Sequence, residues 1–228
     1  MAHSEEMAAI LRRALTYPYA TPGRSYLYLE GAAEELPDGS PDLAERTPLL
    51  SYGANAAPEA LALKLASLPG VAMPVLRAEL EHFDVVYSAH VSPYGAVPAT
   101  LVESPGTRAP VFVVYPTAEQ LALLTAQELN YDLIIFSEVS CRLEDGTVVT
   151  ELAGYRSKHG PLALDGSEVA LAAVRSRGRT LPELDQPAVL ERVRVHLEPA
   201  LELEEFIHAC IERGGIKPLR IGAARPGR

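Results

Sequence analysis

The sequence contains no tryptophan, only four phenylalanines and only two cysteines, Cys141 and Cys210. Two cysteines are too few for a disulfide framework, and their spacing matches no metal-binding motif. The six histidines never pair at the spacing of metal ligands, so the sequence predicts no metal site. These absences favour a reducing compartment, and we expect a cytoplasmic protein.

The signature motifs of several enzyme classes are also missing. There is no GxSxG, no Walker-type glycine loop, no HExxH and no GxGxxG after a strand. Ser51 and His90 are conceivable as a nucleophile and its base, but no nucleophile elbow or orienting acid accompanies them. The sequence therefore predicts no cofactor.

Positive charge is scarce, because 20 Lys and Arg residues face 30 Asp and Glu residues, for a formal net charge of -10. A nucleic-acid groove would need a basic patch on a protein whose net charge is negative, so we expect no nucleic-acid partner. Only the segment from Gly214 to Arg228 is basic, and it is predicted to be a mobile tail. Use of this tail to bind another protein is one alternative function.

The sequence has no long run of purely hydrophobic residues. The longest window without a charged residue, from Val85 to Val102, does reach the length of a membrane span. His90, Pro93, Gly95 and Pro98 would break a helix in lipid or make it too polar, so the window predicts two strands around a turn. The charged residues near the N-terminus also argue against a secretory signal peptide. We expect no membrane partner.

What the sequence does contain is typical of a globular protein, with 48% hydrophobic and 22% charged residues. Apolar spacing and capping residues predict helices at 4–15, from Pro58 towards Leu68, at 118–127 after a Thr117 cap, and at 167–174, 187–197 and 201–213. Strands are predicted at 26–29, 83–90, 96–102, 111–115, 132–136, 141–143 and 147–152, and 49–55 is predicted as a strand that runs into a turn. The residues 144–146 predict a hairpin turn between the last two strands. This order predicts an α+β fold.

The sequence shows no internal repeat and no long linker. We therefore predict an N-terminal extension at 1–48 that packs on the core, a single domain at 49–213 that includes the C-terminal helices, and the basic tail at 214–228. The oligomeric state is not predicted.

Two local segments combine suitable chemistry with suitable spacing, and we expect them to share a site. The first runs from a strand into the turn Tyr52-Gly53-Ala54-Asn55, where a glycine allows close backbone approach and consecutive N–H groups cradle a carboxylate. The second contains Glu128 and Tyr131 at the end of the predicted helix. The helix dipole and apolar neighbours are expected to raise the pKa of Glu128, which suits a general base.

Together the Tyr-Gly-Ala-Asn turn, the strand at 111–115, the helix after Thr117 and the Glu128-x-x-Tyr131 spacing resemble the gamma-glutamylcyclotransferase-like (AIG2-like) family. The resemblance covers roughly residues 49–136. It implies a small, mostly antiparallel β-barrel or sheet with surrounding helices, to which this chain adds N- and C-terminal extensions. Ala54 stands where the family has serine, and Ala56 where it usually has leucine.

The resemblance implies an enzyme that cyclises a gamma-glutamyl amine or peptide to 5-oxoproline and releases the amine without a cofactor. By resemblance, Glu128 would be the catalytic acid/base, and Tyr52, Gly53, Ala54, Asn55 and Tyr131 would bind the small-molecule gamma-glutamyl substrate. The alternative is a non-catalytic module of the same fold that binds a small molecule or a protein. The position of the Glu128 carboxylate relative to the turn would favour one or the other.

Overall fold

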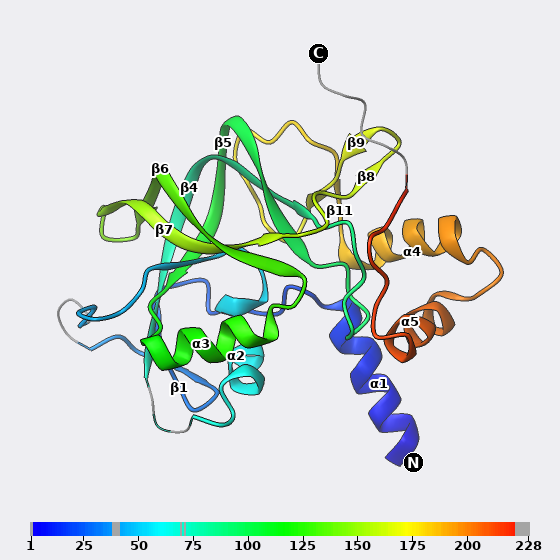
Figure 1. The fold of residues 1–228 in the computed structure, drawn as a ribbon, viewed down its shortest axis with the longest axis horizontal. Coiled ribbons are helices and arrows are strands. Elements are labelled where there is room, and N and C mark those ends of the chain that lie inside the picture. The colour runs from blue at the N-terminus through cyan, green and yellow to red at the C-terminus, as the bar shows by residue number, and fades with distance from the viewer. Residues whose placement is uncertain (1, 38–41, 69, 71, 222–228) are drawn as a thin grey trace.

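The computed structural model describes residues 2–37, 42–68, 70 and 72–221 (Figure 1). Within these residues the α-helices are α1 (Ala2–Leu15), α2 (Pro58–Lys64), α3 (Ala118–Gln127), α4 (Gln186–Leu197) and α5 (Leu203–Glu212), and a 3₁₀-helix, η1, covers Ala54–Ala56. The strands are β1 (Tyr26–Leu29), β2 (Ala32–Glu34), β3 (Leu49–Ser51), β4 (Met73–Tyr87), β5 (Ala99–Val114), β6 (Tyr131–Leu143), β7 (Val148–Ser157), β8 (Ala163–Leu164), β9 (Ser167–Glu168), β10 (Ala170–Leu171) and β11 (Glu183–Leu184). None of the helices described here has the length and apolar content needed to cross a membrane.

Five strands form a closed barrel in the order β4-β5-β3-β7-β6, and β6 pairs back onto β4. All of these pairings are antiparallel except that between β3 and β7. Helices α2 and α3 lie side by side at one end of the barrel, and α1, α4 and α5 gather on another side (Figure 1). The predicted α+β fold with a small, mostly antiparallel barrel and surrounding helices is confirmed.

Strands β4 and β5 form one long, bent hairpin, which corrects the prediction of separate strands at 96–102 and 111–115. The register shifts between Glu81 and Phe83, and residues 104–107 bulge out of β5 at the same level. His82 has a φ of 65° there, and its Nδ1 accepts a hydrogen bond from the N–H of Gly106 at 3.1 Å. Pro105 and Gly106 therefore lie in a bulge inside a continuous strand.

Strand β6 likewise joins two segments that were predicted as separate strands, 132–136 and 141–143. Its register against β7 shifts between Ser137 and Cys141, and Glu138 has a φ of 59°. The hairpin turn predicted before 147–152 is confirmed, since the Gly146 N–H donates to the Leu143 carbonyl at 3.0 Å.

The helix predicted at 167–174 is wrong, because this segment forms β9 and β10. Asp165 and Gly166 have φ values of 53° and 82°, and two consecutive positive φ angles are typical of the tight turn of a β-hairpin. This turn joins β8 to β9, and Ala170 of β10 then pairs with Val86 of β4. Pairing at the sheet edge requires extended backbone, which overrides the helical spacing.

The other predicted helices are present. Thr117 caps α3 through a reciprocal capping box with Gln120, and the Asp185 side chain caps α4 by accepting from the Ala188 N–H at 2.8 Å. The helix predicted from Pro58 ends at Lys64, before Leu68.

The C-terminal segment differs from the predicted mobile tail over its described part. Ile216 exchanges backbone hydrogen bonds of 2.8 and 3.0 Å with Val91, and the Leu219 N–H donates to the Ala89 carbonyl at 2.7 Å. Leu219 and Ile221 are buried. Residues 214–221 therefore pack on the protein, and the prediction for 222–228 lies outside the described residues.

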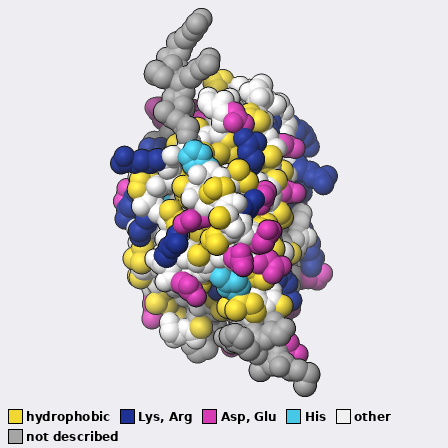
Figure 2. Space-filling view, turned by 90° about the vertical axis from the view of Figure 1, so that its right-hand side faces the viewer, with side chains coloured by type: hydrophobic (Ala, Val, Ile, Leu, Met, Phe, Trp, Pro, Cys, Tyr) yellow, Lys and Arg dark blue, Asp and Glu magenta, His cyan; other side chains and the backbone are white. Residues whose placement is uncertain are grey.

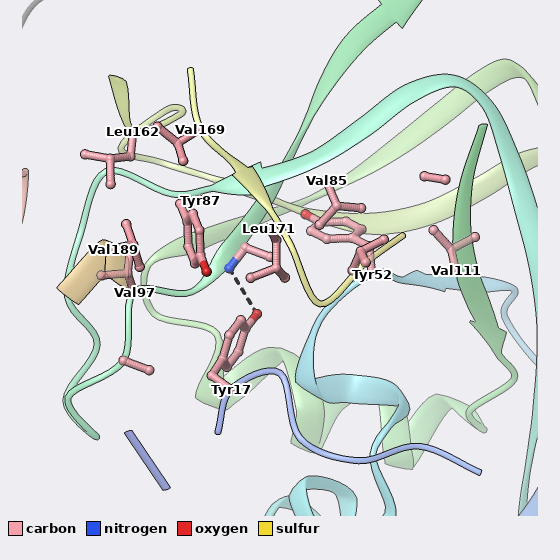
Figure 3. Close-up of a cluster of buried hydrophobic side chains, with 14 of the residues drawn as sticks. Tyr17, Tyr52, Val85, Tyr87, Val97, Val111, Leu162, Val169, Leu171 and Val189 are labelled. Atoms are coloured by element: carbon pink, nitrogen blue, oxygen red, sulfur yellow. Dashed lines mark hydrogen bonds between the residues drawn. The ribbon is translucent and has the colours of Figure 1, made fainter. Parts of the chain in front are cut away.

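The buried side chains form two clusters. The larger one joins the barrel to α4 and α5, and Figure 3 shows Tyr17, Tyr52, Val85 and Leu171 within it. The smaller cluster lies where β1, α2 and α3 meet the barrel. On the face that carries α4 and α5, acidic and basic side chains are interspersed with apolar ones (Figure 2).

Candidate functional site

A cavity of about 330 Å³ lies between the turn after β3, the C-terminal end of α3 and the loop between β4 and β5. The segment after α1 and residues 214–217 complete its walls. The structure places all the predicted site residues in this lining: Tyr52, Gly53, Ala54, Asn55, Glu128 and Tyr131. The two segments that were expected to share a site therefore lie together.

The turn after β3 is packed tightly against the N-terminal segment. A Cβ on Gly53 would lie 2.4 Å from the Tyr17 hydroxyl, so no side chain fits at this position. Tyr52 is buried, and its hydroxyl donates to the Tyr155 carbonyl. Among the described residues, no hydrogen-bond partner engages the backbone N–H groups of Gly53, Ala54 and Asn55. The three residues line the cavity at the start of η1, where the first N–H groups of a helix have no partner within it, and this arrangement suits an anionic ligand group.

Glu128 is the C-cap residue of α3, and its carboxylate is held by two side chains. Its Oε1 accepts from Asn55 Nδ2 at 2.9 Å and from Lys64 Nζ at 2.5 Å. Lys64 Nζ also donates to Asn55 Oδ1 at 2.8 Å, which closes a three-membered network. The side chains of Lys64 and Glu128 are only 21% and 13% exposed, so water screens this ion pair less than a surface pair.

The expectation of apolar neighbours for Glu128 is therefore wrong, because its nearest groups are an ammonium and an amide. Lys64 was not identified from the sequence. It is the only basic residue between Arg46 and Arg77, and a single cation on the short helix after the turn was the signal that could have found it.

Tyrosines enclose the inner part of the cavity. The Ala99 N–H donates to the Tyr17 hydroxyl at 3.0 Å, the hydrogen bond drawn in Figure 3, and the Tyr131 hydroxyl donates to the Ala99 carbonyl at 2.8 Å. Burial raises the pKa of Tyr17 and Tyr131 well above the usual value, and neighbouring phenols add to this effect. The phenols therefore remain neutral hydrogen-bonding groups at physiological pH.

His90 is a buried, hydrogen-bonded histidine. Its Nδ1 lies 2.7 Å from the Ser88 hydroxyl, and its ring meets Tyr131 edge to face. Burial lowers the pKa of His90 to about 3, and His159 adds to the shift, so the ring is neutral. The buried Ser51 hydroxyl has no hydrogen-bond partner among the described residues, so the Ser51–His90 nucleophile pair is not formed.

Two further cations line the cavity, and the sequence did not indicate either of them. The Arg13 guanidinium lies over the Tyr94 ring, 5.1 Å from its centroid, and Lys217 Nζ donates to Asn130 Oδ1 at 3.1 Å. Both come from terminal segments that were predicted to lie outside the domain. In the part of the chain that the structure describes, no group of three or more His, Cys, Asp or Glu residues could hold a metal ion.

A second cavity of about 580 Å³ adjoins the first. The two share wall residues of the N-terminal segment and of the turn, including Tyr17, Tyr52 and Gly53. Val111 and Phe112 of β5 give the second cavity an apolar side. The titratable and amide groups described above lie in the first cavity, so the candidate site is there.

No protein-family model matches this chain, and no curated protein sequence matches it. Solved structures similar to it include one titled gamma-glutamyl cyclotransferase, at 20% identity and a TM-score of 0.40, covering 50% of this chain and 68% of that one. An uncharacterised human protein is 21% identical at a TM-score of 0.40, covering 51% and 69%. An Arabidopsis thaliana protein solved in solution is 16% identical at a TM-score of 0.38, covering 53% and 66%.

Proposed function

We propose that this protein is a cofactor-independent enzyme that cyclises a gamma-glutamyl amine or peptide to 5-oxoproline and releases the amine. The observation that carries the proposal is the 2.9 Å hydrogen bond between Glu128 and Asn55, which are 73 residues apart in sequence. It joins the two segments that resemble the gamma-glutamylcyclotransferase-like family, inside a cavity of a size that suits a small molecule.

The reaction requires proton transfer but no redox step. The α-amine nitrogen of the gamma-glutamyl group attacks its own γ-carbonyl carbon, and a new C–N bond closes a five-membered ring. The C–N bond to the leaving amine then breaks. Glu128 takes the proton from the attacking nitrogen and returns it to the leaving nitrogen, so the proton and electron pairs balance without a co-reactant.

The rest of the cavity would contribute positioning. A bound conformation that brings the nitrogen to the carbonyl converts the attack into a favourable intramolecular step. The free N–H groups of Gly53, Ala54 and Asn55 would orient the substrate α-carboxylate or stabilise the developing oxyanion. Asn55 and Lys64 hold the Glu128 carboxylate at a fixed place beside them.

The test is release of 5-oxoproline from a panel of gamma-glutamyl amines and peptides by the wild type and by Glu128→Gln. This substitution keeps the side-chain shape and removes the base, so we expect a rate loss of about 10²- to 10⁴-fold. Glu119→Gln, in the exposed first turn of the same helix, is the matched control and should retain full activity.

Thermal unfolding of both variants shows whether the fold is intact. A folded wild type that releases no 5-oxoproline from any member of the panel would contradict the proposal. Equal activity of Glu128→Gln and the wild type would contradict the assignment of Glu128.

One observation favours the alternative of a non-catalytic binding module. Lys64 and Asn55 both engage the same oxygen of Glu128, so a base in this state has to be released or shared before it accepts a proton. A module of this kind would bind members of the panel, as measured by calorimetry, and return them unchanged.

A further inference from the structure

The charges that line the candidate cavity differ in sign from those of the whole protein. The described lining contains three cationic side chains, Arg13, Lys64 and Lys217, and a single carboxylate, that of Glu128. The chain as a whole carries a formal charge of -10. A local excess of positive charge in an acidic protein attracts and holds an anionic ligand at that place.

Lys64 does not account for this excess, because it is committed to Glu128. Arg13 and Lys217 are different, since neither has a carboxylate within ion-pair distance among the described side chains. The Arg13 guanidinium lies over the neutral Tyr94 ring, a contact that leaves its positive charge unpaired by a carboxylate. Lys217 donates to the neutral amide oxygen of Asn130, and an ammonium has two further protons to donate.

Both cations lie in segments that are anchored to the barrel. Tyr17 lies just after α1, and its hydroxyl accepts a hydrogen bond from the Ala99 N–H. Ile216, next to Lys217, forms an isolated β-bridge with Val91. These anchors hold two exposed cations at the cavity wall, although they come from opposite ends of the chain.

We propose that Arg13 and Lys217 bind an anionic group on the amine portion of the substrate. The cavity would thus select gamma-glutamyl amino acids or peptides, whose amine portion ends in a carboxylate, over neutral gamma-glutamyl amines. This inference rests on the proposed function, in which the turn N–H groups and Glu128 serve the glutamyl portion. The two cations are specificity-determining residues and take no part in proton transfer.

A matched pair of substrates isolates the charge. Gamma-glutamyl-L-alanine and gamma-glutamyl-L-alaninamide have nearly the same shape, and only the first carries a carboxylate on its amine portion. We expect kcat/KM for 5-oxoproline release to be roughly ten times higher for the acid, mainly through KM, because two partly exposed cations each contribute a modest ion pair.

Substitutions then assign the effect to residues. Arg13→Gln and Lys217→Gln should each lower the ratio of kcat/KM for the acid to kcat/KM for the amide roughly threefold. Arg12→Gln and Arg220→Gln are matched controls, because these exposed arginines lie one and three residues from Arg13 and Lys217 and do not line the cavity. Both controls should keep the wild-type preference.

The outcomes separate the two proposals. Equal kcat/KM for the acid and the amide, or an acid preference that survives in Arg13→Gln/Lys217→Gln, would overturn this inference and leave the proposed function standing. Absence of 5-oxoproline from both compounds, and from the wider panel, would overturn the proposed function and this inference with it. An acid preference that falls in each single variant, disappears in the double variant and persists in both controls would support both proposals.

Discussion

His90 occupies an unusual position for a titratable side chain, because it is 1% exposed and bonded only to neutral groups. The Ser88 hydroxyl that it contacts is itself bonded to Ser157 at 2.6 Å, so the ring belongs to a fixed polar network behind Tyr131. With a pKa lowered to about 3, the ring stays neutral in the folded state at pH values where an unfolded histidine is protonated.

The resulting prediction concerns stability at acid pH. The folded pKa of His90 lies below the unfolded value of 6.5, so its contribution is fully present above pH 6.5 and is lost as the pH falls towards 3. We expect the wild type to lose about 1.4 kcal/mol per pH unit more than His90→Asn between pH 6 and pH 4. Urea unfolding of both proteins at several pH values measures this difference, and parallel curves would contradict it.

At the scale of single residues, the sequence predicted those residues of the candidate site that have a local signature. Glu128 and the turn from Tyr52 to Asn55 could be found because a strand end and a helix end mark them. Arg13 and Lys217 could not be found, because their place in the cavity depends on how the terminal segments return to the barrel. Side-chain spacing along one element carries no information about that return.

At the scale of elements, a buried ion pair fixes the segment between β10 and β11 to the barrel. Asp84 of β4 is fully buried, and both of its oxygens accept from Arg179 at 2.8 Å. Its Oδ1 also accepts from the Ser176 hydroxyl at 2.7 Å and from the Val85 N–H at 2.8 Å. The Asp84 carboxylate thus fixes this long connection, together with the two backbone hydrogen bonds of 2.9 Å between Arg177 and Arg108.

Removing the cation from this pair should be costly. In Arg179→Met the Asp84 carboxylate stays buried without its partner, so we expect a loss of about 3–5 kcal/mol in the free energy of unfolding. The matched control is Arg177→Met, since Arg177 is 81% exposed and lies 4.0 Å from Glu79. Chemical denaturation should show almost no effect of the control, and equal effects of the two substitutions would refute the prediction.

The elements differ in how well the sequence predicted them. Helix α3 was predicted residue by residue, because Thr117 and Gln120 form a capping box that depends only on neighbours in the chain. Strand β6 was divided around Glu138, and β4 was predicted only from residue 83, just after His82. At both places a residue with positive φ carries the strand through a bulge. Such bulges depend on the partner strand, so alternation along one strand does not reveal them.

At the scale of the whole molecule, the two cysteines report on two parts of one core. Cys141 lies in β6 of the barrel and Cys210 in α5, and both are free, fully buried and part of the larger cluster. Burial raises the pKa of Cys141 to about 12 and that of Cys210 to about 11. Both thiols should therefore be inert towards alkylating reagents in the native protein.

Whether residues 49–213 unfold as one unit stays a prediction that these thiols test. Urea titration with a thiol reagent at pH 8 should show both cysteines becoming reactive together, at the midpoint where the circular dichroism signal is lost. Reaction of Cys210 at a lower urea concentration than Cys141 would mean that the C-terminal helices form a separate unit. Mass spectrometry of the labelled protein distinguishes the two sites.

The tyrosine-rich wall of the cavity has an optical consequence. Six of the ten tyrosines line it, namely Tyr17, Tyr19, Tyr52, Tyr94, Tyr131 and Tyr155. Because the chain has no tryptophan to accept their excitation energy, the intrinsic fluorescence of the protein comes from its tyrosines. The molecule thus carries a built-in fluorophore around its candidate site, and ligand entry can be followed as a change in tyrosine emission without any label.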